Sequence, residues 1–204
     1  MTTLPDTDGV LAFWFGEAFR DPAAARVRGD RWFVGDAALD ADIVRRFGPL
    51  YEAARAGALG AWEGTPRSAL ALVLVLDQFP RNMFRGTAAA FATDGLALGV
   101  ATRAVARGLD AALAPIGRCF LYLPFQHAED LVVQARAVAL YERLATDAPP
   151  AWRETMNTNL AYANDHYRVI ARFGRFPHRN ACLGRESSPS EQAYLAAGAT
   201  RYGQ

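Results

Sequence analysis

The feature that most constrains this chain is a helix with no polar face. Thr65 and Pro66 form an N-cap and a first-turn proline, and every residue from Ala69 to Leu76 is apolar. A helix that is apolar on all sides has to be surrounded by other elements, and this run is far shorter than the roughly 20 residues that cross a bilayer. We therefore expect a central helix through Ala69 to Phe79, covered by neighbouring helices.

Helical periodicity recurs along the rest of the chain, whereas the alternating β-branched segments that indicate strands are missing. A capping box at Ser188 and Glu191 begins a short last helix. The other expected helices cover about residues 8–19, 36–56, 93–108, 125–145 and 151–173, with a bend or break at Gly48 and Pro49. The predicted fold class is all-α: a single compact domain over residues 1–204, with six to eight helices in antiparallel pairs, as in a tetratricopeptide-like α-α superhelix or a bundle.

Charge and composition narrow the classes of partner. The formal net charge is +1, so no strong positive field draws the chain onto nucleic acid or an anionic membrane, and we expect neither as a partner. The N-terminus lacks the basic segment and apolar core of a signal peptide, which favours a cytoplasmic protein. All 22 basic residues are arginine, which excludes chemistry that needs a lysine amine. Cys119 and Cys182 match no metal-binding spacing, and we expect reduced thiols and no cofactor.

Asp77 is the first polar residue after the apolar run. It lies seven positions after Leu70 and four after Val73, on a face of the expected helix that has little access to water. An unpaired buried carboxylate is costly, so we expect a partner from Arg81 or from the segment Arg175–Arg179. A purely structural tie between this helix and the rest of the fold is the alternative to a functional role.

A second polar group follows Pro124, which with the acids after it resembles the first turn of a helix. On that reading His127 and Asp130 share one face, where they could hydrogen-bond or hold a common ion. Asp130 could equally well complement the helix dipole. Because the stretch has neither a His-Glu-x-x-His arrangement nor a cysteine pair, we predict no metal ligands.

Arginines follow the helix expected over residues 151–173 and continue past its end. The polar stripe consists of Asn157, Asn164, Arg168, Arg172 and Arg175, and it continues into Arg179 and Arg185. With His178, these arginines could receive a carboxylate or a phosphate, or they could form a solvated helix face. His166 falls on the apolar side instead, which predicts a hydrogen-bonded core histidine.

Two short stretches, Phe79–Asn82 and Phe176–Asn180, share the pattern Phe-Pro followed by Arg-Asn. The repetition could be chance, or the two could be equivalent turns that end helices and whose asparagines satisfy exposed backbone groups.

Three longer blocks resemble the signature blocks of the domain-of-unknown-function 924 family. They are Asp77–Gly86 (DQFPRNMFRG), Pro124–His127 (PFQH) and Arg172–Asn180 (RFGRFPHRN), accompanied by Trp14–Gly16 and Leu183–Glu186. The resemblance covers nearly the whole chain and implies a compact helical domain similar to tetratricopeptide-type proteins, with no established activity. It also implies a ligand site where the blocks converge. The family often has serine after the histidine of the second block, and Ala128 here argues against a serine–histidine nucleophile.

Three functions follow as hypotheses. The leading one is a helical domain that binds a small anionic molecule or an acidic peptide through Arg81, Asn82, Arg175, Arg179 and Asn180, with Asp77, His127 and Asp130 orienting the arginines. The second is a hydrolase-type enzyme with a His/Asp general base, with or without a metal, whose catalytic candidates are His127, Asp130, Asp77 and His178. The third is a structural interaction scaffold without a ligand.

Overall fold

The chain folds into a single all-α domain. The computed structural model describes residues 4–33 and 35–198, and these contain helices and turns but no strand. Its α-helices are α1 (Thr7–Phe15), α2 (Pro22–Phe33), α3 (Ala37–Arg55), α4 (Pro66–Val73), α5 (Phe79–Met83), α6 (Asp94–Ala106), α7 (Pro115–His127), α8 (Leu131–Asp147), α9 (Arg153–Phe173) and α10 (Pro189–Ala196). Short 3-10 turns join several of them, and a π-helical turn, η3 (Leu74–Gln78), separates α4 from α5. No helix among these residues is long and apolar enough to cross a membrane.

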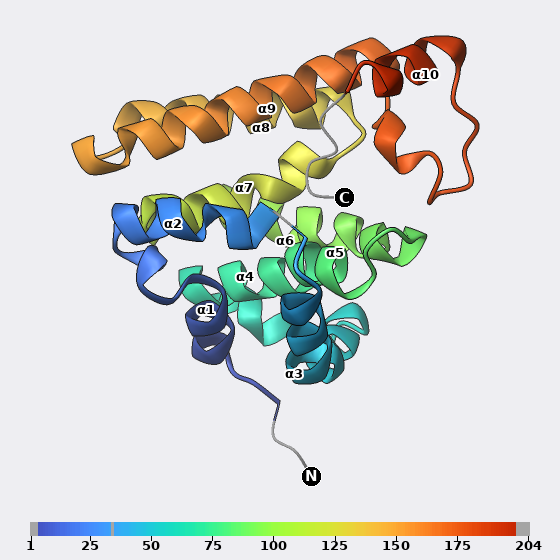
Figure 1. The fold of residues 1–204 in the computed structure, drawn as a ribbon. Coiled ribbons are helices and arrows are strands. Elements are labelled where there is room, and N and C mark those ends of the chain that lie inside the picture. Colours follow the sequence, from blue (N-terminus) through green and yellow to red (C-terminus); the bar gives the residue numbers. More distant parts are fainter. Residues whose placement is uncertain (1–3, 34, 199–204) are drawn as a thin grey trace.

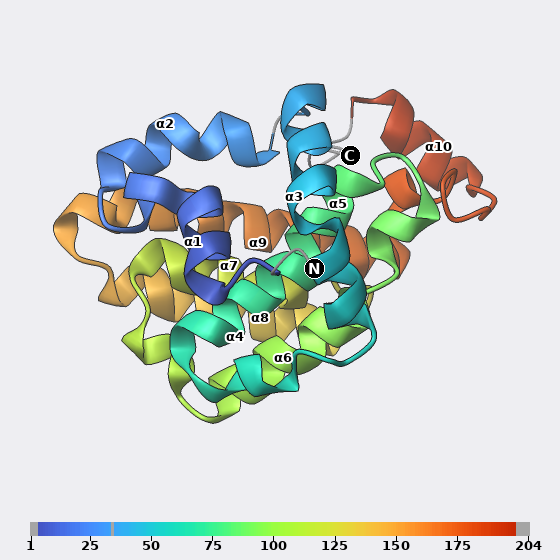
Figure 2. The same ribbon diagram turned by 90° about the horizontal axis from the view of Figure 1, so that it is seen from below.

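The helices pack in layers around α4 and α7. Helices α8 and α9 form a long hairpin over one side of α7, while α4 and α6 lie against its other side (Figure 1). Helices α1 and α3 cover the remaining faces of α4 and α5, which the view from below also shows (Figure 2). The C-terminal segment with α10 folds back beside the end of α9. The prediction of a compact all-α domain is confirmed, with more helical segments than expected among the described residues.

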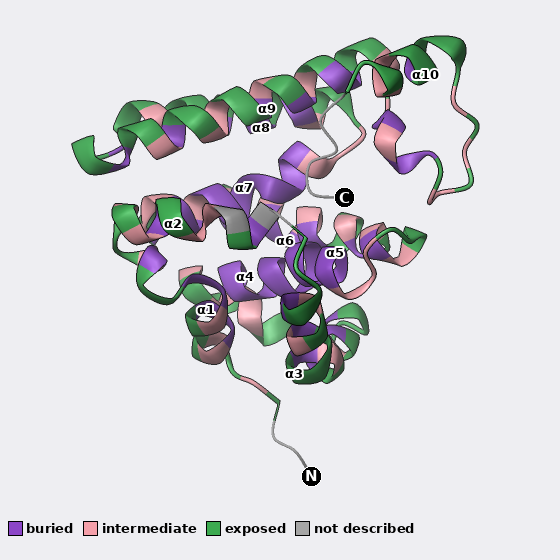
Figure 3. Cartoon of the chain, in the orientation of Figure 1, coloured by how far each residue is buried: buried purple, intermediate pink, exposed green. Residues whose placement is uncertain are grey.

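The core follows the middle of the chain. Burial is continuous from Ala69 to Asn82, through most of α4, η3 and α5, and α7 is buried along most of its length, whereas α8 and α9 are buried on one side only (Figure 3). Aromatic rings fill the space between α1 and this centre: Trp14 and Phe15 each pack edge-on against Phe120. Gly117 lets α7 pack closely against Phe19 and against Leu70 of α4. A β-carbon at this position would lie 3.1 Å from the Phe19 ring and 3.2 Å from a Leu70 methyl. The residues of η3, α5 and α7 that contribute to the site therefore lie in the buried centre of the domain.

The central helix begins as expected but changes geometry before it ends. Thr65 and Ser68 form the N-terminal capping box of α4, and Pro66 occupies its first turn. The next turn is π-helical, with the Phe79 N–H bonded to the Leu74 carbonyl five residues back. A π turn inserts an extra residue into a helix and is frequent at functional sites. The stretch Phe79–Asn82 consequently lies in α5, so of the two interpretations left open above, the one as a turn that ends a helix does not hold for this stretch.

Other boundaries differ from the expected ones for identifiable reasons. The single helix expected over 125–145 is wrong: Pro124 lies inside α7, which ends at His127, and α8 begins at Leu131 after a gap of three residues, with Asp130 as its N-cap. Helix α3 runs without a break through Pro49. Helix α2 was not expected at all, because the stretch is rich in arginine and alanine and has no strong apolar stripe. The helix expected over 151–173 is confirmed by α9, which Gly174 ends at φ 70°.

Candidate functional site

The π turn carries Asp77 into the interior. Its side chain is fully buried, at 0% exposure. Two carbonyls of this turn accept hydrogen bonds from side chains: Leu76 from the Thr93 hydroxyl at 2.6 Å, and Asp77 from the Arg81 guanidinium. The first contact fixes the start of α6 beside the turn, and the second folds Arg81 back toward Asp77. The local geometry of the central helix therefore gathers charged groups around one carboxylate.

Asp77 is paired on every side. One carboxylate oxygen lies 2.8 Å from His127 Nδ1 and 3.4 Å from Arg81, and the other accepts a hydrogen bond from the Gln78 amide at 2.6 Å. Burial by itself would raise the pKa of Asp77, but the charge of Arg81 and the contacts with His127 and Gln78 hold it well below its usual range. Asp77 is therefore ionised at neutral pH, and the expectation that it needs a partner is confirmed.

His127 stands at the C-terminal end of α7 with one ring nitrogen committed. Since ionised Asp77 can only accept, Nδ1 carries the proton of that hydrogen bond, and Nε2 is left with the lone pair. Burial, together with the positive charge of Arg81, lowers the pKa of His127 despite the nearby carboxylates. His127 is thus neutral at neutral pH, and its side chain retains 12% exposure.

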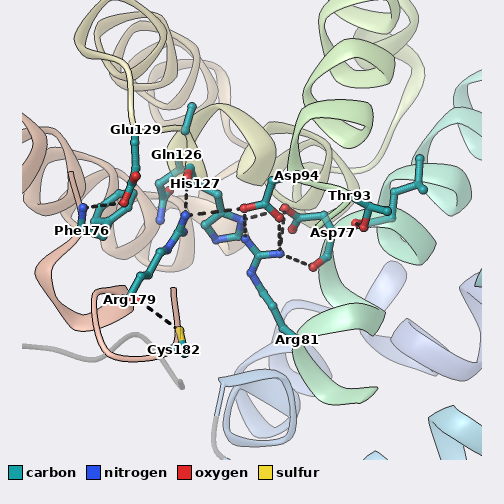
Figure 4. A network of polar contacts seen from close by, with 12 residues as sticks. Asp77, Arg81, Thr93, Asp94, Gln126, His127, Glu129, Phe176, Arg179 and Cys182 are labelled. Carbon is teal, nitrogen blue, oxygen red and sulfur yellow. Dashed lines mark hydrogen bonds and ion pairs between the residues drawn. The ribbon is translucent and has the colours of Figure 1, made fainter. Parts of the chain in front are cut away.

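Arg81 and Arg179 reach Asp94 from opposite sides, with the His127 ring between them (Figure 4). Arg81 binds both carboxylate oxygens of Asp94, at 2.9 and 3.0 Å. Arg179 lies 3.6 Å from one of the same oxygens and donates to the His127 carbonyl at 3.1 Å. We call Asp77, Arg81, Asp94, His127 and Arg179 the Asp94 cluster. Its members come from η3, α5, α6, α7 and the 3-10 turn η7 (Pro177–Arg179), so it brings together residues that lie up to about 100 positions apart in the sequence.

Arg179 is the least satisfied member of the Asp94 cluster. Its guanidinium lies between two aromatic rings, 4.6 Å from the centre of Phe91 and 4.5 Å from that of Phe176, and the residue is 6% exposed. Its buried Nε has no hydrogen-bond partner among the described residues. Burial and repulsion from Arg81 lower the pKa of Arg179 to about 10, so it stays charged at neutral pH. A buried cation with an unused donor is a site that an anion would satisfy.

The other histidines border the cluster. His166, 3% exposed, packs its ring 6.3 Å from that of His127 and directs Nδ1 to the Tyr162 carbonyl at 2.7 Å. The prediction of a hydrogen-bonded core histidine is therefore confirmed. Burial lowers the pKa of His166 to about 3, and burial with the adjacent Arg179 does the same for His178. The His178 ring lies against the Phe176 ring, with centroids 5.5 Å apart and the ring planes tilted by 42°.

The structure brings some predicted site residues together and separates others. Asp77, Arg81, His127 and Arg179 meet in the Asp94 cluster, which agrees with the expected convergence of the three blocks. Asp130 is instead exposed and caps α8 through Val132 and Val133, so the expectation that it shares a helix face with His127 is wrong. No group of three or more His, Cys, Asp or Glu side chains within residues 4–33 and 35–198 is placed to hold a metal ion.

The remaining candidates serve contacts elsewhere. Arg175 forms two hydrogen bonds with Glu191, at 2.7 and 2.8 Å, and one with the Glu186 carbonyl. Asn82 donates to Asp40 at 2.8 Å, and Asn180 donates to Ser187 at 3.1 Å. These contacts hold neighbouring segments in place around the cluster.

Sequence reasoning missed Asp94, Phe91 and Gln78. Asp94 was visible only as an acid in the first turn of an expected helix, where a favourable interaction with the helix dipole explains it without any site. Phe91 lies in a short 3-10 turn, η4 (Ala88–Phe91), which the hydrophobic periodicity of the sequence does not predict. A sharper signal was available in the shared Arg-Asn ending of the two Phe-Pro stretches, because Arg81 and Arg179 are the two residues that converge on Asp94.

Fold and site together define a class: an all-α domain in which a buried carboxylate of the central helix pairs with a histidine at the end of α7, flanked by two arginines. The model of the family described as bacterial protein of unknown function (DUF924) matches residues 10–199, and the chain belongs to this family. It is also similar to a solved structure, the protein of unknown function ATU0120 from Agrobacterium tumefaciens. That similarity has a TM-score of 0.80 and 41% sequence identity, and covers 94% of this chain and 97% of the other. No curated protein matches the sequence.

Proposed function

We propose that the protein binds a small anionic molecule, or an acidic group of a peptide, at Arg179 in the Asp94 cluster. The observation that carries this proposal is the pairing of Arg179. The residue is almost fully buried, its nearest carboxylate contact is 3.6 Å, and its Nε has no partner in the described parts of the chain. Burying a guanidinium in this state is costly unless something else completes its contacts.

Other arginines of the same region support the proposal by contrast. Arg185 forms two close contacts with Glu129, at 2.6 and 2.9 Å, although its own buried Nε also has no partner among the described residues. Arg175 forms two close contacts with Glu191. Each of these arginines has a carboxylate of its own, whereas Arg179 shares Asp94 with Arg81, which holds both oxygens. The two flanking rings keep the Arg179 guanidinium in one plane, so a planar carboxylate could approach it in a fixed orientation.

Calorimetric titration of purified protein with a panel of carboxylates, phosphates and acidic peptides tests this proposal. We expect at least one of these anions to bind. Arg179→Gln should weaken that binding by about tenfold or more, because it removes at least one charge-assisted hydrogen bond to the anion. Arg103→Gln is the matched control, because it removes an exposed arginine that pairs with Glu63 and is not a member of the Asp94 cluster. Equal binding by wild type, Arg179→Gln and Arg103→Gln, or no binding by any anion, would show the proposal to be wrong.

A second candidate function is general-base catalysis of a hydrolytic type by the pair Asp77–His127. The specific observation in its favour is the 2.8 Å contact on Nδ1, which orients the ring and leaves Nε2 as the basic atom of a neutral imidazole. A hydrolase screen with carboxyl esters and phosphate esters tests it. Activity that is lost in His127→Asn, with anion binding retained, would support a catalytic role, whereas anion binding without turnover of any ester would leave binding as the function.

A further inference from the structure

The formal charges of the Asp94 cluster cancel. Asp77 and Asp94 contribute two negative charges, Arg81 and Arg179 contribute two positive ones, and His127 is neutral. The adjacent pair Glu129–Arg185 is also neutral as a whole. An anion that binds at Arg179 would therefore give a largely buried site a net negative charge, which is unfavourable without compensation.

We propose that the site takes up a proton on His127 together with a monoanionic carboxylate, so that the ligand is bound in effect as the neutral acid. This inference rests on the proposed function and names its ligand class. The step is a proton transfer only: Nε2 of His127 forms an N–H bond with a proton given up by solvent or buffer, and no other bond changes.

The position of His127 makes it the group that can compensate for the negative charge of the bound anion. Its Nδ1 is held by Asp77, its backbone carbonyl is held by Arg179, and its ring lies between the two arginines that meet on Asp94 (Figure 4). The charged and titratable groups that face it from the surrounding elements are Asp77 (η3), Arg81 (α5), Asp94 (α6), His166 (α9), and His178 and Arg179 (η7). In the free protein burial and the charge of Arg81 prevail, and they lower the pKa of His127. An anion bound at Arg179 adds a negative charge close to His127, which favours the protonated imidazole.

The same count of charges discriminates between ligand classes. A carboxylate with one protonated His127 leaves the cluster neutral. A phosphate monoester carries close to two negative charges above its second pKa of about 6, so it would leave the site negative even with His127 protonated. We therefore expect a carboxylate to bind more tightly than a phosphate of similar shape.

The direction of the pH dependence follows from linkage. His127 in the free protein has a lowered pKa, and the anion raises it, so the complex holds more protons than the free protein over the interval between the two values. Affinity for the carboxylate then increases as pH falls through that interval, by up to about tenfold per pH unit. Below the lower pKa the affinity no longer depends on pH.

Benzoate and phenyl phosphate form a matched pair of probes, because they share a ring and differ in charge. Titration calorimetry at about pH 8 in two buffers of different ionisation enthalpy gives the number of protons taken up. We expect about one proton per benzoate where His127 changes fully between its two states, and at least tenfold weaker binding of phenyl phosphate. In His127→Asn the amide can take the place of Nδ1 beside Asp77 but cannot titrate, so benzoate should bind with no proton uptake.

A measurement on the wild-type chain covers the case in which His127→Asn does not fold. The ring signals of His127 in proton NMR should titrate at a higher pH with benzoate than without it. Benzoate binding with no proton uptake and an unmoved His127 titration, or phenyl phosphate binding as tightly as benzoate, would overturn the inference and leave anion binding intact. Failure of both probes to bind would instead contradict the anion-binding proposal itself.

Discussion

Two arginines only four residues apart, Arg175 and Arg179, have opposite surroundings. Arg175 is partly exposed and meets Glu191 through two short hydrogen bonds, which attach α10 to the end of α9. Arg179 is buried between two rings and reaches its carboxylate at 3.6 Å, because Arg81 already occupies both oxygens of Asp94. The difference shows that two arginines of one sequence block can have different roles. Arg175 is fully paired with a carboxylate and holds two segments together, whereas Arg179 shares the carboxylate of Asp94 with Arg81. Of these two arginines, Arg179 is the one at which we propose that a ligand binds.

The largest effect on stability should come from Asp77, on which the Asp94 cluster depends. Asp77→Asn removes the negative partner of His127 and one of the two carboxylates beside Arg81, which keeps Asp94. We expect it to lower the free energy of unfolding by about 3 kcal/mol. Urea unfolding measures the change. Asp165→Asn is the control, since it removes an exposed carboxylate that pairs with Arg168 one turn away on α9. If the two substitutions cost the same, Asp77 is not the carboxylate that holds the cluster together.

The next effect concerns acid stability and His166. Its pKa in the folded protein, about 3, is below its ordinary value of 6.5, so folding disfavours its protonated form. The contribution of neutral His166 to the free energy of unfolding is fully present above pH 6.5. It is lost as pH falls toward 3, by up to about 1.4 kcal/mol per pH unit. In His166→Asn the amide can donate to the Tyr162 carbonyl but does not titrate, so urea unfolding between neutral pH and pH 5 should depend less steeply on pH. An unchanged slope would contradict the account.

Arg175→Gln should have a local effect. It removes the bonds to Glu191, and we expect faster amide hydrogen exchange in α10, with a change in Tm below about 3 °C. Anion affinity should stay within twofold of wild type, because Arg175 does not contact the Asp94 cluster. A loss of affinity comparable to that of Arg179→Gln would remove the distinction between the two arginines.

The smallest effect is expected from the exposed pair Arg103–Glu63. Although its hydrogen bonds are short, at 2.6 and 2.8 Å, the Arg103 side chain is 57% exposed. Exposed ion pairs contribute little, so Arg103→Gln should change the free energy of unfolding by less than about 1 kcal/mol. A larger loss in urea unfolding would mean that a short hydrogen-bond distance predicts the stabilising energy of an ion pair even when the pair is exposed. That result would contradict our use of burial to distinguish the arginines.

Much of the fold could be predicted because its signals are local. The N-cap at Thr65 and the capping box at Ser188 each act within one turn, and both lie where the sequence predicts them. The break between α7 and α8 could not be predicted in the same way. Pro124 is tolerated inside α7, and the break depends on Asp130 capping the next helix.

The site was predictable only in part, because it depends on contacts that are distant in sequence. The environment of Asp77 follows from the apolar run before it, and its need for a partner follows from electrostatics. Which partner it finds does not follow, since His127 is 50 residues away. The π turn that brings Asp77 inward and the sharing of Asp94 by two arginines leave no pattern in the sequence.

The most direct test of the central claim is a nitrogen–proton NMR spectrum of the arginine Nε–H groups during titration with benzoate, with Arg175→Gln and Arg179→Gln used to assign the two signals. The account predicts that the Arg179 Nε–H signal moves as benzoate is added, because this donor gains a partner, while the Arg175 signal stays in place. Movement of the Arg175 signal alone, or of neither signal at benzoate concentrations that saturate binding, would contradict it.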